Sequence, residues 1–177
     1  TVQLMRLDEL AVRLGPDRIG PDALSIECDE LRQRLRRSRR AIKVALLDQK
    51  VVAGIGNIYA SEILHLAHVH PAARCDLLGR LQWERIHQAM REVLEDAIRH
   101  EGSTLSDGSY RNALNNPGSY QARHQVYARD GEACLRCEGK QVQRIVQAQR
   151  STFFCPGCQT RRTWKETDGL QVALAAR

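Results

Sequence analysis

Apolar residues recur at helical spacing in several segments of the chain, and this pattern predicts a mainly helical domain. In the longest segment, 81–100, apolar side chains return every three or four positions with charged residues between them. Two shorter segments, 41–48 and 57–67, lie on either side of a stretch that contains Gly54 and Gly56. Because glycines permit a tight turn, we expect a helix, a glycine turn and a second helix in this region.

Another helix is expected from Asp29 onwards, with Asp29 as its N-cap and with Leu31 and Leu35 on one apolar face. Arginines occupy most of the remaining positions of this segment. Such a run of charge is either a solvated face or an edge that faces nucleic acid, and the pattern alone leaves both open. The arginines are Arg32, Arg34, Arg36, Arg37, Arg39 and Arg40.

The helical pattern ends in a long segment without periodicity. Residues 103–120 are rich in Ser, Asn, Gly and Pro, which predicts a loop of a length that is often functional. Short strands around paired cysteines are expected after it. We therefore predict an irregular, linker-like lead-in at 1–24, a helical domain at 25–120, a cysteine-bearing module at 121–159 and a loose C-terminal tail at 160–177.

Four of the six cysteines form two CxxC pairs separated by 17 residues, whereas Cys28 and Cys75 stand alone. Close pairs separated by a hairpin-length segment favour metal ligation over a disulfide framework. Four thiolates complete a tetrahedron around one structural Zn²⁺ and leave no position open for water. An iron-sulfur cluster or a redox pair is the alternative. The predicted zinc ligands are Cys134, Cys137, Cys155 and Cys158.

A β-hairpin is expected between the two cysteine pairs, with strands at 142–146 and 151–154 and a turn at 147–149. Arg150 would then lie near the hairpin tip, where its guanidinium could make a two-pronged contact with a phosphate. An ordinary solvent-exposed arginine is the alternative interpretation.

The charge of the chain agrees with a polyanionic partner but does not identify one. The 27 Lys and Arg residues outnumber the 21 Asp and Glu residues, which gives a formal net charge of +6. No run of 18 apolar residues and no secretory leader is present, so we expect a soluble, intracellular protein.

The segment Gly54-Ile55-Gly56-Asn57 at a predicted helix start has the features of an anion site. Glycines permit close backbone approach, and a helix N-terminus exposes N–H groups that suit a DNA phosphate. The alternative is that the glycines only form a turn and that Asn57 only caps its own helix. Lys43, on the preceding helix, would then be ordinary surface charge.

Two stretches of the chain resemble the formamidopyrimidine-DNA glycosylase and endonuclease VIII family. Residues 42–62, IKVALLDQKVVAGIGNIYASE, resemble its helix-two-turns-helix motif, and residues 134–158, which include RSTFFCP at 150–156, resemble its zinc finger. The resemblance extends from about residue 25 to residue 159. It implies a mainly α fold, with a helix-two-turns-helix domain followed by a small zinc β-hairpin.

The resemblance also assigns roles to individual residues. It places the family's phosphate-binding asparagine at Asn57 and its zinc-finger arginine at Arg150, with Lys43, Gly54 and Gly56 beside them in the DNA-binding site. The four paired cysteines take the place of the zinc ligands. Residues 104–120 take the place of the loop that closes over an everted damaged base.

The resemblance implies that this chain is the DNA-binding part of a base-excision repair glycosylase and abasic-site lyase that acts on oxidised purines and binds phosphates around a flipped nucleotide. The implied partner is double-stranded DNA with a damaged base or an abasic site. We expect a monomer in the bacterial cytoplasm, associated with the nucleoid.

Catalysis in this family begins with an N-terminal proline that attacks the sugar, and here the first residue is Thr1. We therefore expect that this polypeptide alone does not excise bases. A non-catalytic protein that binds damaged DNA or other nucleic acid is an alternative, and a zinc-stapled module that binds protein is a second.

Overall fold

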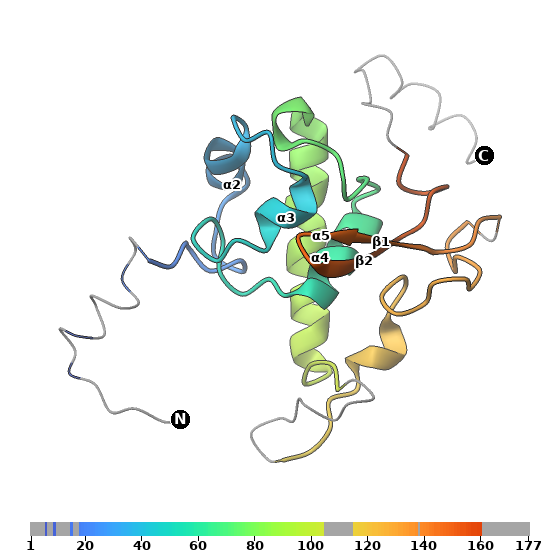
Figure 1. The fold of residues 1–177 in the computed structure, drawn as a ribbon. Helices are drawn as coiled ribbons and strands as arrows, with labels where there is room; N and C mark the ends of the chain where they lie inside the picture. The colour runs from blue at the N-terminus through green and yellow to red at the C-terminus, as the bar shows by residue number, and fades with distance from the viewer. Residues whose placement is uncertain are drawn as a thin grey trace, which may run out of the picture.

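A computed structural model describes residues 18–104, 115–137 and 139–160, together with residues 6, 9 and 15. It shows a helical body that carries a two-stranded hairpin (Figure 1). This arrangement confirms the predicted mainly α architecture followed by a small β-hairpin. In chain order the elements are α2 (Cys28–Leu35), α3 (Ile42–Leu46), α4 (Asn57–Leu66), the 3-10 helix η1 (Cys75–Leu77), α5 (Arg80–Arg99), the 3-10 helix η2 (Tyr120–Arg123), β1 (Gln143–Gln147) and β2 (Arg150–Phe154).

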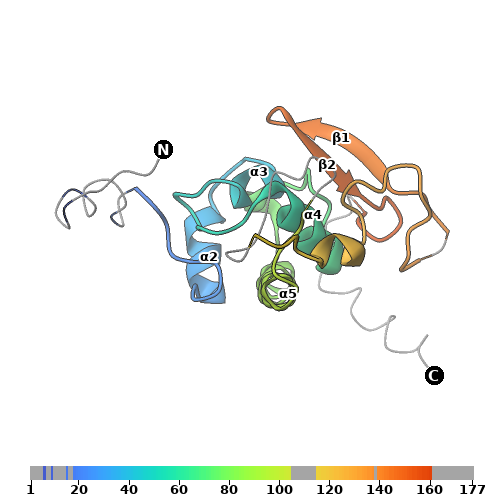
Figure 2. The same ribbon diagram turned by 90° about the horizontal axis from the view of Figure 1, so that it is seen from below.

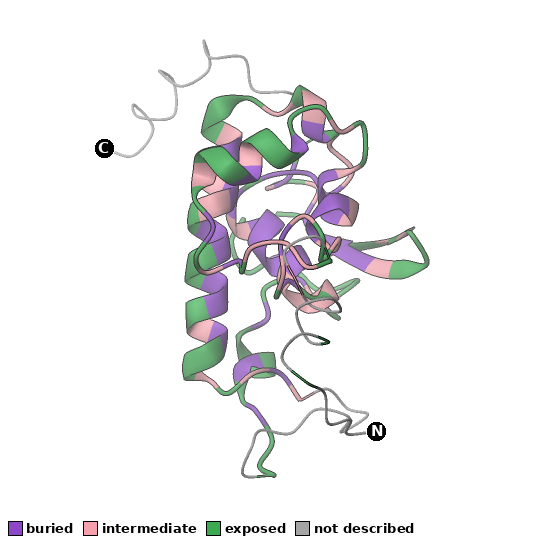
Figure 3. Ribbon diagram, turned by 90° about the vertical axis from the view of Figure 1, so that its left-hand side faces the viewer, coloured by how far each residue is buried: buried purple, intermediate pink, exposed green. Residues whose placement is uncertain are grey.

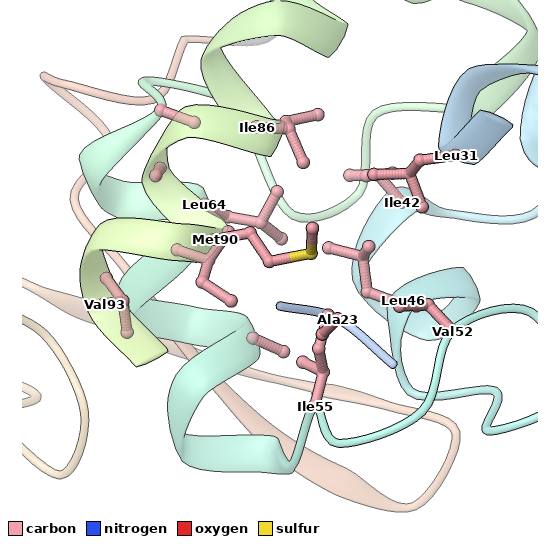
Figure 4. Packing of buried hydrophobic residues seen from close by; sticks show 14 of the residues in the cluster. Ala23, Leu31, Ile42, Leu46, Val52, Ile55, Leu64, Ile86, Met90 and Val93 are labelled. Carbon is pink, nitrogen blue, oxygen red and sulfur yellow. The ribbon is translucent and has the colours of Figure 1, made fainter. Parts of the chain in front are cut away.

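The helical body forms around one side of α5. Figure 3 shows this helix buried along one side and exposed along the other, as its sequence pattern requires. The buried side packs against α2 and α4. Figure 4 shows Leu31, Ile42, Leu64, Ile86 and Met90 meeting in this core, and each of the five is fully buried.

Helix bounds agree with the predicted segments to within a few residues, but the predicted N-cap at Asp29 is wrong. The helix already includes Cys28, and the N-cap is Glu27, which has an extended backbone and no side-chain capping bond. Asp29 therefore lies in the first turn, where a carboxylate still interacts favourably with the helix dipole.

The hairpin has its own small core, which is formed by Val126, Val142 and Phe153. The strands pair antiparallel, with Gln147 opposite Arg150, so the connection consists of Ala148 and Gln149 alone. Both of these residues have positive φ, at 46° and 61°, as a two-residue hairpin turn of the primed type demands. The predicted three-residue turn was thus one residue too long.

Helix α4 lies between α5 and the hairpin. In Figure 2, α5 lies on one side of α4 and the hairpin lies on the other. Both α5 and β2 pack directly against α4. Residues 20–23 run beside the glycine turn, where the N–H of Gly20 donates to the carbonyl of Gln49 (2.8 Å) and that of Ala23 donates to the carbonyl of Ala53 (2.9 Å).

Two predicted segments fall mostly outside the described residues. They are the loop 104–120, of which 105–114 is not described, and the tail 160–177, of which only Thr160 is described. Within the described ranges, no helix combines the length and the apolar character needed to cross a membrane.

Candidate nucleic-acid interface and metal centre

Lys43 connects the helix pair to the hairpin. Its ammonium donates to Asn57 Oδ1 (2.7 Å), to the Ser151 carbonyl oxygen (2.9 Å) and to Thr152 Oγ1 (2.8 Å). These three acceptors match the three hydrogens of an ammonium group. The residue is only 1% exposed, so the interpretation of Lys43 as ordinary surface charge is wrong.

Asn57 points towards the hairpin and does not cap its own helix. Gly56 is the N-cap of α4, and no side-chain capping bond is present there. The Asn57 amide instead donates to the Ser151 carbonyl oxygen from Nδ2 (3.0 Å) while its Oδ1 accepts from Lys43. The alternative that Asn57 serves only as a helix cap is therefore wrong.

Arg150 lies immediately beside this network. It begins β2, directly before Ser151, and its side chain is exposed. Among the described residues, the guanidinium has neither a hydrogen bond nor an ion pair. Its charge is near enough to act on Lys43, because burial first and the charge of Arg150 second lower the pKa of the Lys43 ammonium to about 8. Asn57 thus hydrogen-bonds to the residue that follows Arg150 on β2.

The two glycines serve different purposes. Gly54 has a φ of +96°, which side-chain-bearing residues rarely adopt, and its N–H donates to Gln49 Oε1 (3.0 Å). Gly56 has an extended backbone, and a Cβ added there would meet nothing within 4 Å. The N-terminal turn of a helix leaves N–H groups without intrahelical acceptors. The space beside Gly56 therefore gives a ligand access to the N–H groups at the start of α4.

Two polar partners in this site were not predicted from the sequence. Thr152 is fully buried and accepts from Lys43, and Arg144 on β1 donates to Ser151 Oγ (3.1 Å). A threonine between Ser151 and two phenylalanines gives no local sign of a buried acceptor. Alternation along the predicted strand could have placed Thr152 on the inner face.

The four paired cysteines form a cluster whose dimensions suit a tetrahedral ion. All four sulfurs lie within 4.8 Å of one another, with Cys134 and Cys158 at 3.8 Å and Cys137 and Cys155 at 3.6 Å. Zn–S bonds of about 2.3 Å place the corners of a tetrahedron about 3.8 Å apart, whereas a disulfide needs about 2.05 Å. The cluster therefore fits one structural Zn²⁺ with no open coordination position.

The two lone cysteines lie outside the metal cluster. Cys75 is fully buried, and this burial raises the pKa of its thiol to about 11. Burial also raises the pKa of the Cys28 thiol. Because only the thiolate is reactive, a raised pKa makes both thiols poor nucleophiles; Cys75 is buried, whereas Cys28 is only partly buried.

Glu62 attaches the segment before the metal cluster to α4. Its carboxylate is 2% exposed and accepts from the backbone N–H groups of Gln125 (2.9 Å), Val126 (3.1 Å) and Tyr127 (2.8 Å). Burial is the largest influence and raises the pKa of the carboxyl group, while the three N–H donors lower it. Sequence reasoning did not single out this residue.

Comparison with known proteins identifies both parts of the chain. The family model described as the formamidopyrimidine-DNA glycosylase H2TH domain matches residues 14–109, which is more than half of the chain. The chain belongs to the formamidopyrimidine-DNA glycosylase family. A second model, described as the zinc finger found in FPG and IleRS, matches residues 131–161. This match favours zinc over the iron-sulfur alternative for the four cysteines.

Individual relatives in this glycosylase family support the assignment. A formamidopyrimidine-DNA glycosylase of Thermomicrobium roseum is 46% identical over 153 residues, which cover 86% of this chain and 51% of the relative. One from Chloroflexus aurantiacus is 45% identical over 142 residues, which cover 79% and 50%. The chain thus spans about half the length of the curated relatives it matches.

Solved structures of the family share the fold. The MutM (Fpg) protein of Thermus thermophilus superimposes with a TM-score of 0.81 at 41% identity, covering 90% of this chain and 60% of that chain. A complex of the Lactococcus lactis Fpg with DNA that contains an abasic site gives a TM-score of 0.80 at 36% identity, covering 88% and 57%.

Proposed function

We propose that this chain is the DNA-binding part of a base-excision repair glycosylase and abasic-site lyase. The observation that carries the proposal is the Lys43 network, which joins Asn57 to the strand residue that follows Arg150. Residues that bear an amide and a guanidinium are thereby brought close together from two separate parts of the fold. Such donors bind phosphate oxygens and fix a protein on DNA without reading its sequence.

Each group of the network has a distinct part in this proposal. The Asn57 amide nitrogen carries two hydrogens, and one of them remains for a phosphate after the bond to Ser151. Arg150 contributes a guanidinium that no described residue engages, and Gly56 leaves room for the DNA backbone at the start of α4. All three Lys43 donors are used within the protein, so Lys43 orients Asn57 and does not itself bind the phosphate. Its positive charge still favours a nearby phosphate.

The proposed partner is double-stranded DNA with a damaged base or an abasic site. The similar Lactococcus lactis protein has been solved with abasic-site DNA and with DNA that contains Fapy-dG. We propose that the present chain likewise binds phosphates around an extruded nucleotide, and that an oxidised purine is the lesion. The segment 104–120 is the proposed lesion-recognition loop, and it lies largely outside the described residues.

The domain limits and the cellular setting are part of the same proposal. We propose a lead-in at 1–24, a DNA-binding domain at 25–120, a zinc finger at 121–159 and a tail at 160–177. We also propose a monomer that works in the bacterial cytoplasm at the nucleoid; the relatives, which come from bacteria, support the bacterial setting alone.

Titration of the chain with labelled duplexes at several salt concentrations tests the proposal. One duplex carries a stable abasic-site analogue and a matched duplex is undamaged. We expect tighter binding to the damaged duplex and a steep, linear fall of log affinity with log salt concentration, because phosphate binding releases counterions. Equal affinity for both duplexes would refute lesion-directed binding, and salt-independent binding would refute phosphate contact.

A further inference from the structure

The last turn of α4 and the residues directly after it contact both cysteine pairs of the metal cluster. His65 Nε2 lies 3.6 Å from the sulfur of Cys134, which belongs to the first pair. His68 Nδ1 lies 3.2 Å from the carbonyl oxygen of Cys158, which belongs to the second. The C-terminal end of α4 and the residues that follow it therefore contribute polar groups to both sides of the metal cluster.

The direction of the His65 contact follows from the chemistry of the ligand. A metal-bound cysteine is a thiolate without a proton, so Cys134 can only accept a hydrogen bond. His65 must therefore carry its hydrogen on Nε2 and donate to the sulfur. Since His65 is 2% exposed and Cys134 is fully buried, solvent competes little for this bond.

Neighbouring hydrogen bonds fix the position of the two cysteine turns relative to the end of α4, and so that of Cys134 relative to His65. Arg136, which lies between the first two cysteines, donates to the carbonyl oxygens of His65 and Leu66 at the end of α4, both at 3.3 Å. Gln159 donates from Nε2 to the Val69 carbonyl oxygen (2.9 Å), and its Oε1 accepts from the N–H of Cys155 (2.9 Å). Both cysteine turns are thus anchored to the same helix end.

The backbone of His68 gives independent support. This residue has a φ of +58° directly beyond the end of α4, a conformation that glycine adopts more readily. His68 adopts this unfavourable backbone conformation, and its Nδ1 lies within hydrogen-bonding distance of the Cys158 carbonyl oxygen in the second cysteine turn.

We propose that His65 is a positioning residue of the metal centre, and that its hydrogen bond to the Cys134 thiolate makes α4 part of the outer shell of the zinc site. Outer-shell partners orient metal ligands, and their loss typically weakens metal binding about 10- to 100-fold. Zinc affinity of this chain therefore depends on a residue of the helical domain as well as on the four cysteines. The inference does not depend on DNA binding.

The chain with the substitution His65→Phe tests this proposal, because phenylalanine keeps an aromatic ring and removes the donor. His124→Phe is the matched control: His124 is also buried, but its Nε2 hydrogen-bonds to Ser103 Oγ (3.0 Å), and no hydrogen bond links it to a cysteine among the residues described. Zn²⁺ affinity is measured by competition with a chromophoric chelator. The thiolate-to-metal charge-transfer band is measured after substitution with Co²⁺.

We expect His65→Phe to bind Zn²⁺ about tenfold more weakly or worse, and its Co²⁺ charge-transfer band to move to longer wavelength. A thiolate that has lost its hydrogen bond gives up electron density to the metal more readily. His124→Phe should change neither quantity. Unchanged affinity and spectrum in His65→Phe, or equal changes in His124→Phe, would overturn the proposal.

A second variant separates hydrogen bonding from folding. His65→Gln retains an N–H donor on a flexible side chain, so its charge-transfer band should lie between those of the wild type and His65→Phe. If His65→Phe fails to fold, His65→Leu takes its place as the variant without a donor. A His65→Gln spectrum identical to that of the variant without a donor would count against a hydrogen-bonding role.

Discussion

The ammonium of Lys43 donates a 2.7 Å hydrogen bond to the side chain of Asn57, and both residues also bond to the carbonyl oxygen of Ser151. Three backbone segments therefore meet at the buried ammonium of Lys43: α3, the start of α4 and the start of β2. The orientation of the proposed phosphate ligands depends on this meeting point. Lys43 stabilises the site through hydrogen bonds within the protein and not through contact with DNA.

Replacing Lys43 with Met tests this interpretation. The variant keeps the bulk of the chain but leaves the acceptors on Asn57, Ser151 and Thr152 without their donor. Because an unsatisfied buried polar group costs about 1–3 kcal/mol, we expect the free energy of unfolding to fall by about 2–3 kcal/mol in chemical denaturation. Lys50→Met, at an exposed lysine, is the control. Equal stability of the two variants would show that the network contributes nothing.

The pKa of Lys43 predicts a pH dependence. Burial, followed by the charge of Arg150, lowers this pKa from 10.5 to about 8 in the folded chain. Between pH 8 and 10.5 the unfolded lysine therefore binds more protons than the folded one, so the Lys43 contribution to the free energy of unfolding increases with pH. The stability difference between wild type and Lys43→Met, measured at about pH 7 and about pH 9.5, should grow at the higher pH. A constant difference would contradict the lowered pKa.

Much of the fold could be predicted from local patterns. Apolar spacing identified 81–100, where the structure has α5 at Arg80–Arg99, and the CxxC spacing identified the metal cluster. These features depend on residues close in sequence or on one well-defined coordination geometry. The hairpin was likewise predicted, apart from the length of its turn.

The contacts that assemble the site could not be predicted in this way. Thr152 lies 109 positions from Lys43, and no local pattern shows that the two meet. The alternative that Asn57 only caps its own helix was locally reasonable, because its acceptor on Ser151 lies 94 positions away in the sequence. Charged residues are also expected at the surface by default, so the burial of Lys43 and Glu62 went unnoticed.

Glu62→Ala is expected to loosen the attachment of the zinc module. The change leaves three buried or partly buried N–H donors, at residues 125–127, without their acceptor. We expect a loss of about 3 kcal/mol in stability and faster hydrogen exchange at these three amides. Glu92→Ala, at an exposed position on α5, is the control. Unchanged protection of the three amides in Glu62→Ala would disprove the anchoring role.

Removal of zinc should unfold one part of the molecule and leave the other. The core around Val126, Val142 and Phe153 is small, whereas α2 to α5 share a much larger core of their own. Because so small a core needs the metal, a strong chelator should abolish near-ultraviolet signals from Tyr127 and Phe153 while far-ultraviolet circular dichroism keeps most of its helical amplitude. Complete loss of the helical signal would show that the two parts fold as one unit.

The most direct test of the central claim is a binding titration of Asn57→Ala and Arg150→Ala with duplex DNA that contains a stable abasic-site analogue. Loss of a hydrogen bond to a charged group costs about 1.5–3 kcal/mol, so each variant should bind roughly tenfold to a hundredfold more weakly. Arg91→Ala, at an exposed arginine on α5, should bind within about twofold of the wild type. If Asn57→Ala and Arg150→Ala keep wild-type affinity and wild-type stability, these two residues do not bind phosphate and the proposed interface is contradicted.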